Sequence, residues 1–277
     1  MNLKKRLAHR LLWGVSNGPS AARRLNLLNR VKDRQLNVDW HNDSQLFKVT
    51  QSGEHPVYIA RLARIKSKYM TTTSRSNQIV RRYLLDQVRF EKGDVLIDVG
   101  ANIGELSMAL AHKFGVFPVA VEPDPTEIKC LNKNLELFPS LVYSGIAWHE
   151  DCSVTISCSN DTGDTSIALD SADANCIRSK AHKLDSLFGE IRKRSGKSHI
   201  KCVKVEAEGW EPEVLAGAFK LLQATEYVTA DLGPERGSEK SNTVAMCSNI
   251  LFEQGFDMVD ANPRESTFLF RSRRLFD

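Results

Sequence analysis

We predict an α/β fold in which helices cover a mostly parallel sheet. The main observation is that, from Gly93 onward, short apolar runs alternate with stretches of helical periodicity. A second observation is a glycine-containing turn at residues 98–104, directly after the first of these runs. Parallel strands need crossover connections, which are right-handed and place helices on the faces of the sheet. The alternation therefore predicts a layered α/β protein.

The individual elements follow from the same pattern. Parallel strands are expected at residues 95–99, 116–121, 141–147, 200–205 and 227–232. Helices are expected at residues 104–114, 125–138, 212–223 and 242–254. Asp124 is a favourable N-cap for the second of these helices, and Pro125 is a favourable first helical residue. Residues 256–260 and 267–270 can close the sheet as an antiparallel pair. The polar residues 148–199, with an edge strand at 154–158, are expected as an insertion over the edge of the sheet.

Residues 1–92 are expected to form a basic, helical N-terminal extension, and residues 93–277 to form the main domain. Helical periodicity predicts helices at 57–70 and 76–88 with exposed faces rich in Arg and Lys, and a strand is expected near 46–49. Residues 1–36 contain nine Lys and Arg residues and one acidic residue, a net charge of +8, so the remaining chain carries −4. The basic character therefore belongs to the N-terminal arm.

The start of the arm is typical of a short amphipathic basic helix, because Leu3, Leu7 and Leu11 recur every four residues and Trp13 follows. Such a helix can contact anionic lipid headgroups, which predicts peripheral membrane contact through residues 1–36. The simpler alternative is a helix that packs on the body or frays. The negative charge of the remaining chain argues against a nucleic-acid-binding face there.

The composition is that of a globular protein, with 42% hydrophobic and 26% charged residues among 277. No stretch approaches the ~20 apolar residues that span a bilayer. The six cysteines show no C-x-x-C pairing, which excludes a zinc ribbon and a disulfide framework. Reduced thiols in a cytoplasmic protein are the simplest interpretation.

The turn after the first strand has the features of a cofactor-binding loop. Open α/β sheets bind ligands beyond the carboxyl ends of their strands, and Asp98 ends this strand. Gly100 permits a sharp turn, and Gly104 permits the following helix to approach the strand. The spacing is G-x-x-x-G, with Asn102 where a dinucleotide site has the glycine that makes room for a pyrophosphate. A G-K-[ST] sequence is also missing, which excludes a P-loop, so a nucleoside cofactor without a pyrophosphate fits better.

Glu122 follows the second predicted strand, 22 residues after Gly100. An acidic residue at this place can bond the two hydroxyls of a ribose, because an ionised carboxylate offers two acceptor oxygens. The alternative is a tight strand–helix connection with an exposed glutamate. The series of strand, glycine loop, helix, strand and terminal acid favours the cofactor site.

From residue 93 to residue 270 the chain resembles the FkbM-type family of S-adenosylmethionine-dependent methyltransferases. The resemblance rests on four ordered motifs: VLIDVGANIG at 95–104, VEPDP at 121–125, LDS at 184–186 and VKVEAEGWEPEVLAGA at 203–218. It implies the Rossmann-like class I methyltransferase fold and O-methylation, often of sugar hydroxyls. It also implies that five residues line the S-adenosyl-L-methionine site: Asp98, Gly100, Asn102, Gly104 and Glu122. Where the family usually reads K-I-D-V-E-G, this chain reads K-V-E-A-E-G, so Glu206 replaces an aspartate.

Two acidic residues are the candidates for catalysis. Glu206 follows the fourth predicted strand and Asp231 ends the next one, so both are expected at the ligand edge of the sheet. A hydroxyl nucleophile must lose its proton, so one of them is the expected base, or the two orient the acceptor hydroxyls. The alternative for Asp231 is that it satisfies backbone donors only. Two acids can also hold a divalent metal, but no third ligand is evident.

Residues around the same loop are candidates for binding the acceptor. Trp210 can stack on a sugar ring or pack on the sheet, and Glu208 can contact the acceptor or cap the loop at Gly209. Arg236 can bind an anionic acceptor, although an isolated loop arginine is more often solvated.

The functional hypothesis is an S-adenosyl-L-methionine-dependent O-methyltransferase. Its expected acceptor is a small molecule or a glycan, such as a saccharide or a glycolipid precursor, and no nucleic-acid partner is expected. Two alternatives remain at this point. One is an NAD-type oxidoreductase on a similar sheet, against which the missing G-x-G-x-x-G speaks. The other is a non-catalytic binding protein that uses the basic arm.

Overall fold

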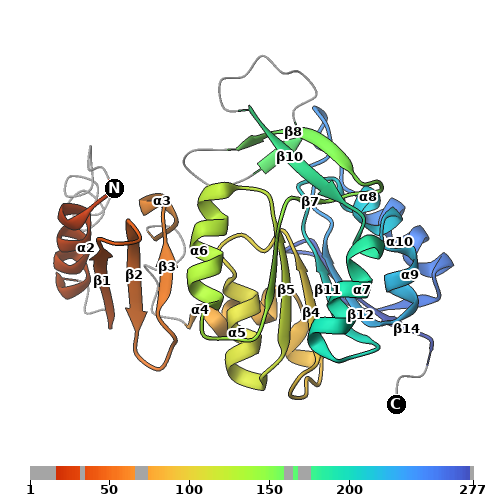
Figure 1. The fold of residues 1–277 in the computed structure, drawn as a ribbon, viewed down its shortest axis with the longest axis horizontal. Coiled ribbons are helices and arrows are strands. Elements are labelled where there is room, and N and C mark those ends of the chain that lie inside the picture. The colour runs from red at the N-terminus through yellow and green to blue at the C-terminus, as the bar shows by residue number, and fades with distance from the viewer. Residues whose placement is uncertain (1–16, 32–34, 66–73, 159–164, 168–175, 275–277) are drawn as a thin grey trace.

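The computed structural model describes residues 17–31, 35–65, 74–158, 165–167 and 176–274 (Figure 1). The amphipathic helix expected at Leu3 to Trp13 lies outside the described residues. Among the described helices, none is both long and apolar enough to cross a membrane.

A seven-stranded sheet forms the centre of the molecule, with the strand order β13-β14-β12-β11-β4-β5-β6. Its strands are β4 (Val95–Val99), β5 (Phe117–Glu122), β6 (Leu141–Ser144), β11 (Ile200–Val205), β12 (Thr225–Asp231), β13 (Phe256–Asn262) and β14 (Thr267–Ser272). The five strands from β12 to β6 run parallel, and β14 pairs antiparallel with both β12 and β13. The predicted Rossmann-like α/β fold and its closing antiparallel pair are confirmed.

Helices cover both faces of this sheet, and every residue of the central strand β4 is therefore buried. Val95, Ile97 and Val99 pack in a core with α7 (Leu184–Ser195), α8 (Glu211–Ala216), α9 (Phe219–Gln223) and α10 (Val244–Glu253). On the opposite face Leu96 packs in a core with α4 (Arg75–Arg82) and α5 (Glu105–Phe114). The helix α6 (Pro125–Leu135) begins as predicted, since the Asp124 side chain accepts from the amide of Thr126 at 2.8 Å.

The helix predicted at 212–223 is interrupted, so that α8 and α9 are separate. A Cβ at Gly217 would lie 1.8 Å from the carbonyl oxygen of Trp148. The backbone at Trp148 therefore approaches the end of α8 at a place where only glycine fits.

Part of the predicted insertion, together with residues 146–147, forms a second, four-stranded sheet with the order β7-β10-β8-β9, while its last part is α7, which packs on the main sheet. The strands of the second sheet are β7 (Ile146–Ala147), β8 (Cys152–Cys158), β9 (Thr165–Ile167) and β10 (Cys176–His182). The strand predicted at 154–158 belongs to β8 and is not an edge strand, because it pairs with both β10 and β9. The strand predicted at 141–147 bends at Gly145, whose φ is +151°, and its last part leaves the main sheet to pair with β10. Because β7 follows β6 directly, the second sheet lies at the carboxyl edge of the main sheet (Figure 1).

The N-terminal segment contains helices and also a three-stranded antiparallel sheet beside α6 (Figure 1). Its elements are α2 (Pro19–Val31), β1 (Leu36–His41), β2 (Leu46–Gln51), β3 (Val57–Ile59) and α3 (Leu62–Arg64), followed by α4 and the 3₁₀ turn η2 (Leu85–Gln87). The helix predicted at 57–70 is wrong at its start, because Val57 and Ile59 are buried on one face of a strand while Tyr58 is half-buried on the other. That alternation has the period of a strand, and Phe47 pairs with Ile59 across the ladder. The helix predicted at 76–88 ends at Arg82. The boundary predicted between residues 92 and 93 stays a prediction.

Candidate active site

The turn after β4 is tightly wound, and three of its residues are in left-handed backbone conformations. The φ angles are +68° at Gly100, +54° at Asn102 and +84° at Gly104. A Cβ at Gly100 would lie 2.1 Å from the carbonyl oxygen of Glu206, so the turns after β4 and β11 are in backbone contact. A Cβ at Gly104 would lie 2.6 Å from Leu131 of α6. The close approach that Gly104 permits is therefore to α6, and not to the strand as predicted.

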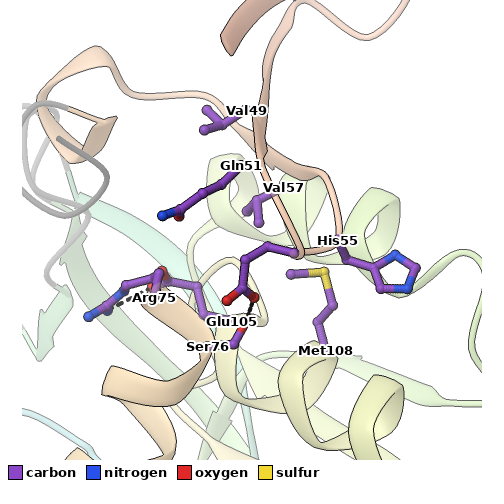
Figure 2. A pocket seen from close by; sticks show the side chains of 9 residues that line it. Val49, Gln51, His55, Val57, Arg75, Ser76, Glu105 and Met108 are labelled. Carbon is purple, nitrogen blue, oxygen red and sulfur yellow. Dashed lines mark hydrogen bonds and ion pairs between the residues drawn. The ribbon is translucent and has the colours of Figure 1, made fainter. Parts of the chain in front are cut away.

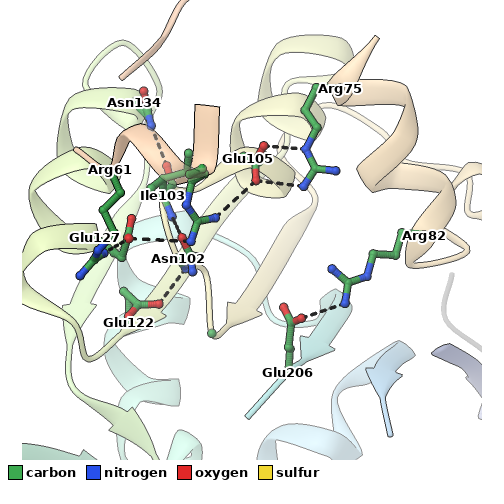
Figure 3. Close-up of polar contacts among 12 residues, drawn as sticks. Arg61, Arg75, Arg82, Asn102, Ile103, Glu105, Glu122, Glu127, Asn134 and Glu206 are labelled. Atoms are coloured by element: carbon green, nitrogen blue, oxygen red, sulfur yellow. Dashed lines mark hydrogen bonds and ion pairs between the residues drawn. The ribbon is translucent and has the colours of Figure 1, made fainter. Parts of the chain in front are cut away.

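Glu122 closes this turn from the end of β5. It is 3% exposed, and its two oxygens accept from the backbone amides of Asn102 at 2.7 Å and Asp124 at 2.8 Å (Figure 3). The alternative of an exposed glutamate is wrong. Burial raises the pKa of Glu122 to about 7, although the two amides oppose this shift. The turn and Glu122, both predicted to line the cofactor site, are therefore in direct contact, and the ribose contact stays a prediction.

Asp98 is buried beneath the turn, where its Oδ2 accepts from the hydroxyl of Ser107 at 2.7 Å. Its Oδ1 lies 3.3 Å from the Nζ of Lys204. Lys204, 2% exposed, also donates to the carbonyl oxygens of Val99 at 3.0 Å and Gly100 at 2.8 Å. Burial lowers the pKa of Lys204, but the charges of Glu206 and Asp98 outweigh burial and raise it. Lys204 is therefore the cation that holds the turn, a role that the sequence analysis missed although a lysine in a buried strand is itself a signal.

Glu206 and Asp231 lie at the ends of adjacent strands and share one cation. The Nη2 of Arg82 lies 3.1 Å from Glu206 and 2.7 Å from Asp231, and Figure 3 shows the first of these contacts. The hydroxyl of Tyr83 donates to Glu206 at 2.6 Å, and Lys204 lies 3.0 Å from the same carboxylate. Arg82 and Tyr83 were not predicted as site residues, because the segment 76–88 was interpreted as a helix with an exposed basic face.

The two carboxylates differ in their proton affinity. Burial raises the pKa of Glu206, but the charges of Lys204 and Arg82 outweigh burial and hold it at about 2. Burial and the charge of Glu206 raise the pKa of Asp231, although Arg82 opposes this shift. Asp231 is therefore the stronger base of the pair.

Glu235, in the loop after β12, is a third carboxylate at this edge that the sequence analysis missed. Partial burial and the charges of Asp231, Glu206 and Glu211 raise its pKa to about 7. The residue as a whole is solvent-exposed. Glu235 is not part of a sequence motif, because the acidic residues near it belong to segments that are far apart in the sequence.

Glu211 caps the loop at 206–210. One oxygen of Glu211 accepts from the amides of Ala207 at 2.9 Å and Gly209 at 3.0 Å, and the other accepts from the hydroxyl of Thr243 at 2.9 Å. Glu208 is half-buried with a φ of +50°.

Trp210 packs within the protein on two sides. Its ring centroid lies 5.3 Å from that of Trp148, and the guanidinium carbon of Arg236 lies 5.1 Å from it. Arg236 donates to both oxygens of Glu213 and to the carbonyl oxygen of Gly209, so the expected anion-binding group is already paired. Trp210 is half-buried and keeps part of its surface at the carboxyl edge.

Arginines of the N-terminal segment neutralise the acidic starts of α5 and α6 (Figure 3). Arg61 pairs with Glu127 and lies 2.7 Å from Asp124, and Arg75 lies 2.7 Å from Glu105. Arg61 lies in the segment predicted as a helix with a solvated basic face, and that prediction is wrong for this residue, because Arg61 is buried against α6. Arg75 is half-buried.

A separate shallow pocket, open to solvent, lies between the N-terminal sheet and α4 and α5 (Figure 2). Its lining residues are Val49, Gln51, Glu54, His55, Val57, Arg75, Ser76, Glu105 and Met108. Within the described part of the chain, no group of three or more His, Cys, Asp or Glu side chains is placed to hold a metal ion.

Comparisons with known proteins relate part of the chain to methyltransferases. No family model matches the sequence. The chain is 30% identical over 163 residues to hexuronic acid methyltransferase AglP of Haloferax volcanii, covering 57% of this chain and 63% of that protein. It is 29% identical over 122 residues to the ribosomal protein L11 methyltransferase of Macrococcus caseolyticus, covering 38% of this chain and 37% of that protein. The chain thus spans less than two thirds of the length of either relative. A crystal structure of P. horikoshii TYW2 in complex with MeSAdo matches at 13% identity and a TM-score of 0.42, covering 97% of both chains.

Proposed function

We propose that this protein is an S-adenosyl-L-methionine-dependent O-methyltransferase that acts on a saccharide hydroxyl. The observation that carries the proposal is the closed turn after β4. Glu122, the last residue of the neighbouring strand β5, accepts a hydrogen bond from the amide of Asn102 in this turn. This arrangement supplies a carboxylate for a ribose diol at the ligand edge of the sheet. The FkbM-type resemblance of the four sequence motifs and the 30% identity to a hexuronic acid methyltransferase support it.

The donor set fits a nucleoside cofactor without a pyrophosphate. The Oδ1 of Asn102 accepts from the amide of Ile103 at 2.9 Å, so this side chain uses a loop donor that a phosphate would need. In the proposed complex Glu122 holds the ribose hydroxyls, and Asp98, Gly100, Asn102 and Gly104 line the remaining cofactor site. When bound, the cofactor supplies a methyl group on a sulfonium, which is already activated for transfer.

The protein's own part in the reaction is to hold the acceptor and receive its proton. Asp231 is the proposed base, because its pKa is raised while that of Glu206 is held at about 2. Glu206 orients the acceptor hydroxyls, and Glu208 and Trp210 are the proposed flanking contacts. Positioning of the acceptor oxygen in line with the departing sulfur accounts for most of the expected rate gain.

The proposal also covers the class of acceptor, the cellular location and a contact with membranes. The proposed acceptor class is a small saccharide or a glycan precursor, and the proposed location is the cytoplasm, because the free thiols of the described cysteines suit a reducing compartment. Peripheral membrane contact through residues 1–36 is a further part of the proposal. Deleting residues 1–16, which leaves the buried residues of α2 in place, tests it, and liposome association is expected to fall while turnover is kept.

Calorimetry with S-adenosylhomocysteine, followed by methyl transfer from labelled S-adenosyl-L-methionine to a panel of saccharides, tests the function. The expected result is saturable binding at one site per chain, with label on a hydroxyl of at least one saccharide. Replacement of Glu122 by Gln is expected to weaken binding roughly tenfold to hundredfold, because hydrogen bonds to a charged group are the strong ones. No heat at saturating cofactor, with no labelled product, would overturn the proposal.

A further inference from the structure

The segment that precedes the main sheet reaches the proposed acceptor site through α4. This helix ends at Arg82, and the next residue, Tyr83, is 2% exposed. Both residues lie outside residues 93–270, the part of the chain that carries the four motifs. Their side chains nevertheless end on Glu206 and Asp231, at the carboxyl ends of β11 and β12.

Two buried hydroxyls fix the backbone at this helix end. Thr267 of β14 donates to the carbonyl oxygen of Arg82 at 2.6 Å, and Thr229 of β12 donates to that of Tyr83 at 2.7 Å. Both threonines are fully buried. The last carbonyls of a helix lack partners within the helix, and here two strands of the main sheet supply them.

The chain then turns through a conformation that leucine rarely adopts. Leu84 has a φ of +58° and is 8% exposed. A left-handed conformation at a residue with a Cβ persists only when its surroundings determine it. The buried threonine contacts on the preceding two residues are such surroundings, so the position of Arg82 and Tyr83 is set by the sheet.

The two side chains supply donors to most of the paired carboxylates' oxygens. A single nitrogen of Arg82, Nη2, contacts Oε1 of Glu206 and Oδ2 of Asp231. Tyr83 donates to Oε2 of Glu206, which Lys204 also contacts. The amide of Gly233 donates to Oδ1 of Asp231 at 3.2 Å. Like charges at adjacent strand ends repel each other, and the shared guanidinium offsets this repulsion.

We propose that Arg82 and Tyr83 are positioning residues that hold Glu206 and Asp231 as one fixed carboxylate pair, against which the methyl acceptor docks. The inference rests on the proposed function and adds to it two residues from the N-terminal segment. Their action passes through the carboxylates, so the cofactor site formed by Glu122 and the turn after β4 does not depend on them.

Four variants test this inference: Arg82→Gln, Arg82→Lys, Tyr83→Phe and the control Arg81→Gln. Arg81 is adjacent on the same helix, its side chain is 77% exposed, and its Nε lies 3.9 Å from Asp86. The readouts are cofactor affinity, kcat and KM for the acceptor, the pH profile of kcat/KM, and carbon NMR titration of the carboxyl groups. All are measured below the unfolding temperature of each variant, so that loss of stability alone does not change them.

Arg82→Gln is expected to lower kcat/KM roughly tenfold to hundredfold with cofactor affinity unchanged, since a charge-assisted contact to both carboxylates is lost. The acid limb of its kcat/KM profile is expected to move to higher pH, because Asp231 loses the charge that lowers its pKa. The groups that face Asp231 and set this shift are Glu206, Glu235 and Arg82, while Lys204 and Tyr83 face Glu206. Arg82→Lys is expected to restore part of the activity and of the profile, Tyr83→Phe to give a smaller loss, and Arg81→Gln to match the wild type.

Identical kinetics and pH profiles for Arg82→Gln and Arg81→Gln would overturn the inference. If the wild-type protein binds no S-adenosyl compound, the proposed function fails. The carboxyl titration then tests by itself whether Arg82 holds the carboxylate pair. Higher titration midpoints for Glu206 and Asp231 in Arg82→Gln support the inference, and unchanged midpoints overturn it.

Discussion

At the scale of single residues, Gly100 decides whether the turns after β4 and β11 can meet. We expect Gly100→Ala to destabilise the protein by about 2–5 kcal/mol, because a left-handed alanine is strained and its Cβ meets the Glu206 carbonyl. Cofactor binding should be lost as well. Urea unfolding and calorimetry measure the two effects. Gly196→Ala is the matched control, since Gly196 has a φ of +70° and nothing within 4 Å of its Cβ position. Equal losses in both variants would show that the close approach is unimportant.

Glu122 should make cofactor binding depend on pH. Its pKa is raised to about 7, and the ionised carboxylate is the form that accepts from both ribose hydroxyls. Affinity for S-adenosylhomocysteine should therefore rise as the pH rises from about 5.5 to 7.5. Calorimetry across this range checks the trend, and Glu122→Gln should bind weakly with little of this dependence.

The stability of the ligand-free protein should change with pH in the opposite direction. Burial favours the protonated form of Glu122 in the folded state, so its contribution to stability is largest below its ordinary pKa of 4.5. That contribution is lost as the pH rises from about 4.5 to about 7. Urea midpoints of the wild type and Glu122→Gln isolate it, since the glutamine does not titrate. A difference between the two that stays constant from pH 4.5 to 7 would contradict the raised pKa.

At the scale of elements, local pattern predicted those elements whose signals lie within their own sequence. The apolar run of β4 and the Asp124–Pro125 start of α6 are of this kind. The strand β3 was missed because Ile59, together with Leu62 and Ile65, also fits helical spacing. The partner that decides between the two interpretations is β2, and a pairing between strands is not visible in a window of one element.

The contacts of the N-terminal arginines with α5 and α6 predict a large effect at the element scale. Arg61 is 7% exposed between the buried carboxylates of Asp124 and Glu127. We expect Arg61→Gln to destabilise the protein by about 3–5 kcal/mol, since it removes the cation nearest to two buried carboxylates, although Arg64 still lies 3.7 Å from Glu127. Urea unfolding measures this, and Arg23→Gln, an exposed position on α2, should change the stability by less than about 0.5 kcal/mol. Similar values for the two variants would mean that water replaces the guanidinium.

At the scale of the whole molecule, the candidate site is built from segments far apart in the sequence. The motifs predicted the cofactor turn and Glu122, because these residues lie within 30 positions of one another and follow a strand–turn–helix order. Arg82 and Glu235 escaped prediction, since their roles come from contacts across the sheet and from burial. Local order therefore predicts the proposed cofactor turn and the carboxylates that follow the strands, Glu206 and Asp231, while the groups that pair with these carboxylates need the tertiary structure.

The packing of the whole molecule also bears on the boundary expected near residue 93. Side chains of the N-terminal segment, among them Leu25, Phe47 and Ile59, share one apolar core with Leu131 and Leu135 of α6. Tyr83 and other residues of α4 and η2 share a second core with β4 and α5. Both cores would open to water without the first 92 residues, and each large buried side chain contributes about 1.5–3 kcal/mol.

We therefore expect residues 93–277 alone to unfold without a cooperative transition and to bind no S-adenosylhomocysteine. A chain that starts at Asn17 keeps every described element and should unfold at a urea midpoint close to that of residues 1–277. Urea denaturation followed by near-ultraviolet circular dichroism, with and without S-adenosylhomocysteine, compares the three chains. Cooperative unfolding of residues 93–277 with full cofactor affinity would show that the main sheet is an independent domain and that the shared cores add little. The opposite result would mean that the N-terminal segment and the main sheet fold as one unit, which is what a site assembled from Arg82, Glu206 and Asp231 requires.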